Sequence, residues 1–515
     1  MPVYMKGANW IPVHSFPVLD KMQKERYRHL LRSAKEANFN MIRVWGGGIY
    51  EPDFFYELCD SLGIYVWQDF DYSCALYPDD KDFLQNASIE ATEQVRRLAK
   101  HKCIVLWCGN NEVKNGWEDW GWQKKFGYTP QQCHQIEANM DTLFGEDGIL
   151  ARAVKQYAPG KPYIPTSPTW GWGHEESAKK GDAHYWGVWW GELPFESYRD
   201  MTGRFMSEYG FMSYPEINTI RRFFPEIDQL MDSATAADML TLPALLGHQK
   251  HPRGIAIIDQ ALQRYFGVTS RDVSFPRYLY LTQLCGAYGT GLGMEAHRIR
   301  KGHCWGTLYW QLNDCWPVAS WSSIDFYGNW KALHYAAKRL LGDIAVLTEP
   351  TEEDGGVNIY VVSDNKPIKG KLLLSLCDFQ NNTVQQEEEE TASGKSHYYR
   401  LPGGVEKENV VLWVQLYDEN DIPLAEKLHY FVPPKRLHLP QANVACNMAA
   451  DGTVSIVTDN LAFGIALRTE PYVAGHFSDS YFDLMPSNKP HTVKFFPKQS
   501  PSTKKVKIVA EWYNR

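Results

Sequence analysis

Short apolar runs alternate with helical segments through the first two thirds of the chain, and few folds accommodate this pattern. Eight of these runs have the length and composition of buried strands. Strands that alternate with helices form parallel sheets, because each crossover helix returns the chain to the same edge. Eight repeats predict a (β/α)8 TIM barrel with inserted loops. The predicted strands are residues 4–7, 41–45, 65–69, 104–108, 163–166, 183–186, 205–208 and 306–311.

The helices predicted between these runs carry their own start signals. After the first run, Asp20 and Gln23 predict a capping box. After the fourth run, Thr129 and Pro130 predict an N-cap and a first helical residue, with Gln132 completing a second box. An open, doubly wound sheet is the competing architecture, but no GxGxxG motif follows the first run to support it.

The pattern changes to strand-like alternation after the last predicted barrel helix, at residues 330–341. Strand-length runs separated by Asn, Asp, Gly and Pro then predict two small all-β, immunoglobulin-like sandwiches. We therefore expect a barrel over residues 1–345, a sandwich over 346–435 and a C-terminal sandwich over 436–515. Tryptophan follows the same division, since only two of the 19, Trp413 and Trp512, come after residue 346.

Composition and charge exclude several classes of function. The net charge of −8, from 53 basic and 61 acidic residues, comes without a basic stripe, so we expect no nucleic-acid partner. No apolar run reaches the ~18 residues of a membrane span, so no membrane partner is expected. No signal peptide is visible, and the compartment stays open.

The ten cysteines form no CxxC pair, which favours free thiols. The run Glu387–Glu390 predicts an edge strand or a solvated loop.

Polar and aromatic residues gather where the predicted strands end. In a barrel, residues at the carboxyl ends of the strands face the active site, whereas mid-strand residues fill the core. The fourth run ends in Asn110, Asn111 and Glu112, and the seventh ends in Glu208. The other substrate-binding candidates stand at the remaining strand ends or on the loop after Glu112: Arg43, Trp45, Asp69, Trp117, Trp120, His184, Tyr185, Trp186, Tyr209, Trp310, Asn313 and Asp314.

The two carboxyl groups suit retaining glycoside hydrolysis, which needs a nucleophile and an acid/base about 5–5.5 Å apart. We expect the carboxyl groups of Glu112 and Glu208 to face each other across the mouth of the barrel. The acid must keep its proton near neutral pH, and Trp107 or Trp117 would desolvate it. Arg43 would hold the nucleophile ionised. The indole rings would stack on the C–H faces of a sugar. No His/Asp/Glu cluster has metal-ligand spacing, so we expect neither a metal nor a cofactor.

Six motifs resemble, in order, those of glycoside hydrolase family 2, and in particular its β-mannosidases. Together they cover most of the predicted barrel, and their combination is specific although each alone is weak. They are KGANWIP at Lys6–Pro12, RVWGGGIYE at Arg43–Glu51, WQDF at Trp67–Phe70, WCGNNE at Trp107–Glu112, SEYGF at Ser207–Phe211 and YWQLND at Tyr309–Asp314.

The resemblance implies an exo-acting retaining β-mannosidase with Glu112 as acid/base and Glu208 as nucleophile. It also implies that Asn111 contacts the sugar 2-hydroxyl, and the doubled amide Asn110–Asn111 is similar to the mannosidase form. The substrates would be terminal, non-reducing β-D-mannose units of manno-oligosaccharides or N-glycan cores. Asp71 departs from the apolar residue that relatives often carry there, which leaves the fine shape of the sugar pocket open.

Two alternatives stay open at this point. One keeps the mechanism and changes the sugar, to that of a β-galactosidase, β-glucuronidase or exo-glucosaminidase of the same family. The other is an inactive, truncated carbohydrate-binding remnant. Members of the resembled family carry a jelly roll and an immunoglobulin-like domain ahead of the barrel, whereas this chain starts at the first barrel strand. The expectation is that the chain alone is poorly active or unstable.

Overall fold

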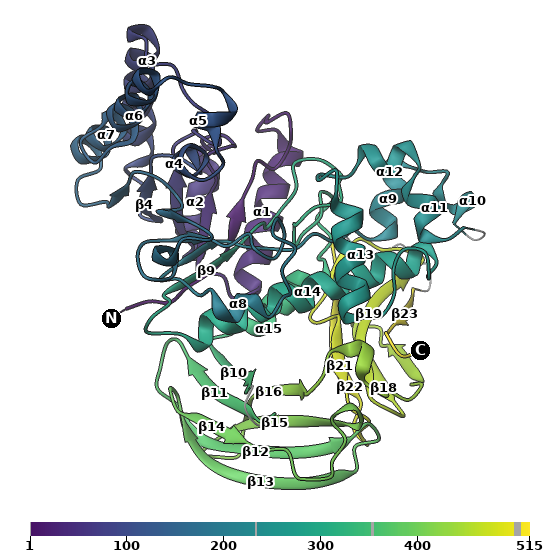
Figure 1. The fold of residues 1–515 in the computed structure, drawn as a ribbon. Helices are drawn as coiled ribbons and strands as arrows, with labels where there is room; N and C mark the ends of the chain where they lie inside the picture. The colour runs from purple at the N-terminus through teal and green to yellow at the C-terminus, as the bar shows by residue number, and fades with distance from the viewer. Residues whose placement is uncertain (1, 232–233, 352–354, 499–505) are drawn as a thin grey trace. The chain divides into compact units, whose positions relative to one another are not determined.

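The computed structural model describes residues 2–231, 234–351, 355–498 and 506–515. The chain forms a TIM-type barrel followed by immunoglobulin-like, all-β sandwiches, as predicted (Figure 1). Its contacts divide into two compact units. The first unit consists of Met1–Phe211 and Arg300–Trp316, and the second of Met212–Ile299 and Pro317–Arg515.

A parallel sheet of nine strands organises the first unit. The strand order is β5-β4-β3-β2-β1-β9-β8-β7-β6, and every neighbouring pair in this order is parallel. All eight predicted strands form, and β6 is an addition that follows the fifth of them. The strands are β1 (Met5–Trp10), β2 (Met41–Val44), β3 (Tyr65–Asp69), β4 (Ile104–Cys108), β5 (Tyr163–Ile164), β6 (Trp170–Gly171), β7 (Ala183–His184), β8 (Met206–Glu208) and β9 (Gly306–Tyr309).

Side chains fill the interior of this sheet. Met41, Trp67, Cys108 and Leu308, from four different strands, are buried against one another. A packed interior is what a TIM barrel requires, because its core is not a pore. The chemistry of the barrel is therefore confined to the ends of its strands.

The helices of the first unit begin largely where the sequence predicts. Thr129 and Gln132 form the full, reciprocal capping box. At the first helix only half of the predicted box forms: Asp20 accepts the backbone N–H of Gln23 at 2.7 Å, while the Gln23 side chain instead accepts the N–H of Val18 at 3.0 Å. The helices are α1 (Lys21–Glu36), α2 (Asp53–Leu62), α3 (Lys81–Leu98), α4 (Val113–Glu118), α5 (Trp122–Lys125), α6 (Pro130–Phe144), α7 (Ile149–Tyr157), α8 (Ser197–Asp200) and the 3-10 helix η1 (Glu175–Ala178).

The second unit opens with helices and continues with β-sheets. Its longest helix, α14, has 25 residues, most of them buried. Among the described residues, none of the helices combines the length and the apolarity that crossing a bilayer would need. The helices are α9 (Ile217–Phe223), α10 (Ile227–Leu230), α11 (Ala236–Leu240), α12 (Pro243–Gly247), α13 (Gly254–Tyr265), α14 (Phe275–Ile299) and α15 (Ala332–Leu340), the last matching the predicted helix at 330–341.

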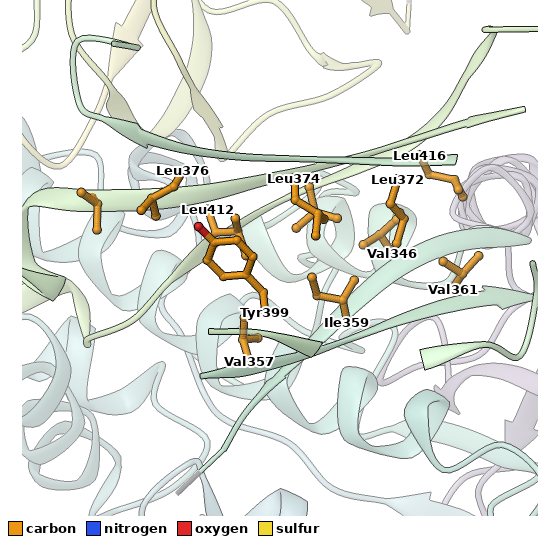
Figure 2. Packing of buried hydrophobic residues seen from close by; sticks show 12 residues of the cluster. Val346, Val357, Ile359, Val361, Leu372, Leu374, Leu376, Tyr399, Leu412 and Leu416 are labelled. Atoms are coloured by element: carbon orange, nitrogen blue, oxygen red, sulfur yellow. The ribbon is translucent and has the colours of Figure 1, made fainter. Parts of the chain in front are cut away.

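Two sheets form the first sandwich, one in the order β10-β11-β14 and one in the order β13-β12-β15-β16. Alternate leucines of β12, Leu372, Leu374 and Leu376, are fully buried and point toward Val357 and Ile359 of β11 (Figure 2). The run of glutamates at 387–390 lies on the edge strand β13, as predicted. The strands are β10 (Ile344–Pro350), β11 (Val357–Ser363), β12 (Lys369–Asp378), β13 (Thr383–Ala392), β14 (Ser396–Tyr399), β15 (Val410–Asp418) and β16 (Pro423–Tyr430), with the 3-10 helix η2 (Lys407–Asn409) before β15.

The C-terminal sheets have the orders β17-β18-β22-β20 and β21-β19-β23 and enclose a second apolar core. The 3-10 helix η3 (Pro434–Arg436) precedes them. Residues 499–505, inside the predicted third domain, lie outside the described residues. The strands are β17 (Val444–Met448), β18 (Thr453–Thr458), β19 (Ala462–Glu470), β20 (Gly475–Phe477), β21 (Phe482–Leu484), β22 (His491–Pro497) and β23 (Lys507–Glu511).

Truncating the core of the first sandwich is expected to destabilise it. Leu374→Ala should lower the free energy of unfolding of the sandwich by about 2–5 kcal/mol, because the buried methyl groups leave a cavity. Val384→Ala on β13 is the matched control, since 51% of the Val384 side chain is exposed. Chemical denaturation of both variants measures the difference, and equal stabilities would contradict the packing of β12 against β11.

Candidate active site

The strand-end residues of the parallel sheet converge on one another, and all of them belong to the first unit. Arg43 lies on β2, Asp69 ends β3, His184 ends β7 and Glu208 ends β8, while Glu112 follows β4 directly before α4. Since neighbouring strands run in the same direction, their carboxyl ends share one edge of the barrel. These side chains contact one another as the strand-end pattern predicts.

Arg43 is the centre of this cluster and is fully buried. Its Nη1 donates to Glu208 Oε1 at 2.5 Å and to Asn9 Oδ1 at 3.0 Å. Its Nη2 donates to Asp69 Oδ2 and to Asn111 Oδ1, each at 2.8 Å, and its Nε donates to Asp69 Oδ1 at 3.3 Å. The planar guanidinium thus grips Asp69 with two bonds and Glu208 with a third. It fixes the positions of two carboxylates and one amide at once.

Removing this guanidinium is expected to lower the stability of the protein. Arg43→Met leaves Asp69 and Glu208 buried without their counter-ion, so the free energy of unfolding should fall by about 3–5 kcal/mol. Arg43→Lys keeps one charge without the planar fork and should lose less. Denaturant titrations of the two variants measure the effect. A Met variant as stable as the wild type would contradict the buried pairing.

The carboxyl groups of Glu112 and Glu208 and the imidazole of His184 lie close to one another beside Arg43. His184 Nδ1 lies 2.8 Å from Glu112 Oε1 and 3.4 Å from Glu208 Oε2. One nitrogen or oxygen atom of each of the three side chains lies within 4.8 Å of the corresponding atoms of the other two. The carboxyl oxygens of Glu112 and Glu208 are therefore close to the spacing of about 5–5.5 Å of retaining glycosidases and closer than the ~6.5–9.5 Å of inverting ones.

The backbone around Glu112 explains how its side chain reaches the mouth. Asn111 forms isolated bridges to Ser73 and Ser167, and its N–H donates to the Tyr72 carbonyl at 2.9 Å. The N–H of Glu112 donates to the Ser167 carbonyl at 2.8 Å. Glu112 then adopts a left-handed conformation with φ 58°, which is uncommon for a residue other than glycine. Bonds on both sides hold this strained turn, as is usual at functional positions.

Asn110 has a different place from the one predicted for it. Its Oδ1 accepts the N–H of Val113 at 3.0 Å and the hydroxyl of Thr166 at 2.8 Å. Its Nδ2 donates to the Pro165 carbonyl at 3.0 Å. The side chain is thus committed to the loop backbone and to the start of α4. These bonds shape the turn, and contact between Asn110 and a substrate stays a prediction.

The pKa values of the two carboxyl groups differ from the expectation. Burial raises the pKa of Glu208 to about 7, against the attraction of His184 and Arg43. Burial also opposes ionisation of Glu112, but the hydrogen bond to His184 together with the charges of His184 and Arg43 outweighs it and holds the pKa of Glu112 below its usual value. The sequence predicts the opposite order, with the higher pKa on Glu112. The reason is His184, whose contact with Glu112 was not foreseen.

Tryptophans from the predicted set fall into two groups. Trp45 and Trp310 form an edge-to-face pair at the strand ends, with ring centroids 5.1 Å apart and planes at 75°. Trp117 is buried and donates its indole N–H to Glu137 Oε1 at 3.1 Å, and Trp120 lies 43% exposed on the same loop. Trp45 and Trp310 follow directly after β2 and β9, and their contact with a sugar stays a prediction.

Five further candidates are buried within the scaffold. The Tyr209 hydroxyl lies 2.5 Å from Thr307 Oγ1, and the Tyr185 ring packs edge-on against Tyr198. The Asn313 amide bonds to the backbone of the β1–α1 loop at 2.8 Å. These contacts tie Tyr185, Tyr209 and Asn313 to neighbouring side chains and to the loop backbone. The five are Tyr185, Trp186, Tyr209, Asn313 and Asp314.

Glu112, His184 and Glu208 also form a grouping of the kind that can coordinate a cation, although their sequence spacing gave no sign of one. A guanidinium nitrogen of Arg43 already lies 2.5 Å from Glu208 and supplies positive charge there. The short contact between the imidazole and Glu112 is that of a hydrogen bond. The contacts among the three side chains and Arg43 are therefore those of hydrogen bonds and an ion pair.

Four polar residues of the site were missed from the sequence. Asn9 positions Arg43 and donates to the Ser207 carbonyl at 2.8 Å. Cys74, an exposed free thiol, lies 3.5 Å from Glu112 Oε2. Ser167 and Asp182 stand behind His184. Asn9 lies near the carboxyl end of β1, so strand-end position could have suggested it, whereas Asp182 precedes β7 at the amino end of that strand and carries no such signal.

Known protein families match the C-terminal part of the chain. Residues 355–436 match the family model of a mannosidase Ig/CBM-like domain. Residues 439–509 match that of an Ig-fold domain found with mannosidases. Both matches agree with the immunoglobulin-like sandwiches of the second unit.

Two curated relatives align with nearly the whole chain. The β-mannosidase of Mus musculus is 30% identical over 536 residues, which cover 96% of this chain and 58% of the mouse protein. β-Mannosidase B of Thermothelomyces thermophilus is 31% identical over 532 residues, covering 94% of this chain and 59% of the fungal protein. The chain thus spans less than two thirds of the length of the relatives it matches.

Solved structures agree in fold. The crystal structure of the β-D-mannosidase from Dictyoglomus thermophilum matches 100% of this chain and 60% of its own chain, with a TM-score of 0.83 and 34% identity. The exo-chitosanase of Amycolatopsis orientalis matches with a TM-score of 0.68 at 15% identity, a likeness of fold alone. The chain belongs to the β-mannosidase family of glycoside hydrolase family 2.

Proposed function

We propose that this chain carries the catalytic centre of an exo-acting, retaining β-mannosidase that removes terminal, non-reducing β-D-mannose by double displacement. The observation that carries the proposal is the pair Glu112 and Glu208, with carboxyl oxygens within 4.8 Å of each other at the strand ends. This spacing favours the retaining over the inverting geometry. Family membership supports mannose as the sugar.

In the first step, a Glu208 oxygen attacks the anomeric carbon of the bound mannoside. The bond from that carbon to the aglycone oxygen breaks, and the oxygen leaves with the electron pair and takes a proton from Glu112. Arg43, 2.5 Å from Glu208 Oε1, orients the attacking group and balances its charge before the attack. The product of this step is a mannosyl ester of Glu208 and a free alcohol.

In the second step, Glu112 acts as a base. It accepts a proton from water while the water oxygen attacks the anomeric carbon and breaks the ester bond to Glu208. Two inversions at the anomeric carbon give net retention. The left-handed turn at Glu112 keeps one carboxyl group in reach of the aglycone oxygen and of the water that replaces it.

Neighbouring residues suit the binding of the sugar itself. Arg43 donates to Asn111 Oδ1 at 2.8 Å. This bond orients the side-chain NH2 of Asn111 toward Glu112. That amino group has only long contacts, of 3.3 Å to Glu112 and 3.4 Å to Ser73 and Cys74, and it is available to a sugar 2-hydroxyl. The Trp45 and Trp310 rings offer an apolar platform.

The pH profile of the proposed reaction follows from the nucleophile. Glu208 must be ionised to attack, and its pKa in the free site is about 7. We therefore expect kcat/KM to fall about tenfold per pH unit as the pH drops below that value, because kcat/KM reports free-enzyme ionisations. Measurement with a 4-nitrophenyl β-mannoside checks this. A profile that stays flat down to about pH 5, near the ordinary carboxyl range, would contradict it.

A panel of 4-nitrophenyl glycosides tests the proposed activity. The β-mannoside should be cleaved with a kcat/KM at least about 100-fold above those of the β-galactoside, β-glucuronide and β-glucosaminide, since a site built for one hydroxyl arrangement rejects others strongly. Faster cleavage of another glycoside would identify its sugar as the substrate and would leave the proposed mechanism unchanged. Binding of mannose in calorimetry without any hydrolysis would leave only a carbohydrate-binding role. Manno-oligosaccharides and N-glycan core fragments then define the natural aglycone.

Domain limits at residues 345 and 435 remain part of the proposal. They assign the whole carboxyl pair and its contacts to the barrel, with the two sandwiches serving as non-catalytic domains. Limited proteolysis that releases fragments at these positions would support the division.

A further inference from the structure

A chain of hydrogen bonds runs from Glu112 into the scaffold behind it. His184 Nδ1 faces Glu112 Oε1 at 2.8 Å, and its Nε2 faces Ser167 Oγ at 2.9 Å. Ser167 Oγ in turn donates to Asp182 Oδ2 at 2.7 Å. His184 and Ser167 are fully buried and Asp182 nearly so. The double displacement described above uses none of these three residues.

Asp182 fixes the direction in which these hydrogen bonds donate. Its Oδ2 also accepts the Ser207 hydroxyl at 2.6 Å, and its Oδ1 accepts the N–H and the hydroxyl of Thr169 at 2.9 and 3.0 Å. All four of these contacts come from N–H or O–H donors, so the buried Asp182 carboxyl group acts as an acceptor. The single proton of Ser167 therefore points at Asp182, and Ser167 Oγ is left to accept a bond from His184 Nε2–H.

The tautomer of His184 follows from this direction. Arg43 Nη1 also lies near Nε2, but at 3.4 Å, and its closer acceptors are Glu208 at 2.5 Å and Asn9 at 3.0 Å. Nε2 thus keeps its proton, and Nδ1 is the nitrogen that gains or loses one. Across the 2.8 Å contact between Nδ1 and Glu112 Oε1 there must be one proton, on either the imidazole or the carboxyl group.

We propose that His184 shares the catalytic proton with Glu112, with Ser167 and Asp182 holding the imidazole so that Nδ1 can store and return it. This inference rests on the proposed function and adds a positioning residue to it. The general acid of the free enzyme is then the Glu112–His184 couple, not an isolated carboxylic acid. It also explains why Glu112 need not hold the proton by itself before substrate binds.

Protons and charges balance through both steps. Before the reaction the imidazole is a cation, and Glu112 and Glu208 are carboxylates. In the first step the Nδ1 proton passes to Glu112, which gives it to the aglycone oxygen, while Glu208 becomes an ester and His184 becomes neutral. In the second step the proton of the attacking water passes to Glu112 and back to Nδ1, and Glu208 leaves as a carboxylate.

The groups around His184 suit this role. Glu112 and Glu208 face its Nδ1, Arg43 lies beside its Nε2, and Asp182 acts on it through Ser167. Burial opposes a charge on the imidazole, but Glu208 and the bond to Glu112 outweigh it, so the pKa of His184 is raised. A cationic imidazole is thus favoured when both carboxylates are ionised, and neutralising either one releases the proton.

Leaving-group dependence separates proton delivery from simple packing. We expect His184→Asn, whose amide keeps a donor near the Nδ1 position but cannot carry a proton, to lower kcat/KM for methyl β-mannoside by on the order of 10- to 100-fold. For 2,4-dinitrophenyl β-mannoside, whose aglycone leaves without protonation, the loss should stay within a few fold. Ser167→Ala should show the same split, and in both variants the alkaline limb of the pH profile should move.

Ser207→Ala is the matched control, because Ser207 donates to the same Asp182 oxygen but does not contact His184. Any loss in this variant should be equal for the two mannosides. Equal losses in the His184 and Ser167 variants would overturn the inference while the wild-type rates uphold the mannosidase proposal. A wild type that cleaves neither mannoside overturns both.

A measurement without turnover tests the tautomer directly. In [15N]histidine NMR of the full chain, the resonances that disappear in His184→Asn should show a protonated Nε2 in the ligand-free enzyme. The same Nε2–H signal should shift or broaden in Ser167→Ala. An unprotonated Nε2 in the wild type would overturn the proposed sharing of the proton, whatever the activity assays show.

Discussion

Glu208→Gln is expected to lower kcat on β-mannosides by about 10⁴- to 10⁶-fold, the scale on which removal of an enzymatic nucleophile acts. The amide has nearly the same shape as the carboxylate and can still accept the 2.5 Å bond from Arg43, so binding should change little. What is lost is the negative oxygen that forms the ester. Steady-state kinetics give the rate loss, and thermal unfolding shows whether the variant is folded.

The stereochemistry of chemical rescue sharpens this test. In Glu208→Ala, azide should enter the vacated space, attack the face opposite the aglycone and give an α-mannosyl azide. In Glu112→Ala, azide should attack the mannosyl ester of Glu208 and give the β-mannosyl azide. Products of the opposite configuration would exchange the two roles. A folded Glu208→Gln enzyme with ordinary turnover would remove Glu208 from the mechanism.

Glu112→Ala is expected to reduce kcat/KM for methyl β-mannoside by about 10²- to 10⁴-fold, the usual contribution of a positioned general acid. For the 2,4-dinitrophenyl mannoside the first step should be almost unaffected, because that aglycone needs no proton. The second step then lacks its base, so the ester should accumulate and a burst of dinitrophenol should precede a slow steady state. Stopped-flow absorbance measures the burst.

The structure also supplies a matched control for the general acid. Glu137, which lies on α6 and accepts the Trp117 indole N–H at 3.1 Å, is a carboxyl group outside the pair. Glu137→Ala should show no dependence on the aglycone. If Glu112→Ala lost the same factor on both mannosides and showed no burst, the acid/base assignment would be contradicted.

Local signals explain why so much of the fold was predictable. Each barrel strand is a short apolar run with its own helix signals after it, and this periodicity does not depend on distant residues. All eight predicted strands accordingly form, while the two-residue strand β6 was missed because Trp170–Gly171 is too short to show a pattern. The sandwich strands were predictable for the same reason, as the alternating burial of Leu372, Leu374 and Leu376 illustrates.

The site was predictable only as far as strand ends reveal it. Position at a strand end predicted that Arg43, Glu112, His184 and Glu208 would meet. It could not predict which partner each side chain selects. Asn110 accepts the N–H of Val113 and donates to the Pro165 carbonyl, and strand-end position could not indicate these partners.

The positions of the protons in the site were the feature that the sequence predicted least. The expected raised pKa of Glu112 depended on nearby indoles, whereas the actual balance depends on an imidazole 72 residues away along the chain. Ser167 and Asp182 act on that imidazole from two further segments. Such a relay exists only after several strand ends have been assembled, so no local pattern encodes it.

Covalent trapping examines the central assignment most directly. The wild-type chain would be incubated with 2-deoxy-2-fluoro-β-mannosyl fluoride, digested and mapped by mass spectrometry. We predict one fluoromannosyl group per chain, attached to the peptide that contains Glu208, and no labelling of Glu208→Gln. A label on the Glu112 peptide, or steady cleavage of β-mannosides with no trapped ester at any position, would contradict the account.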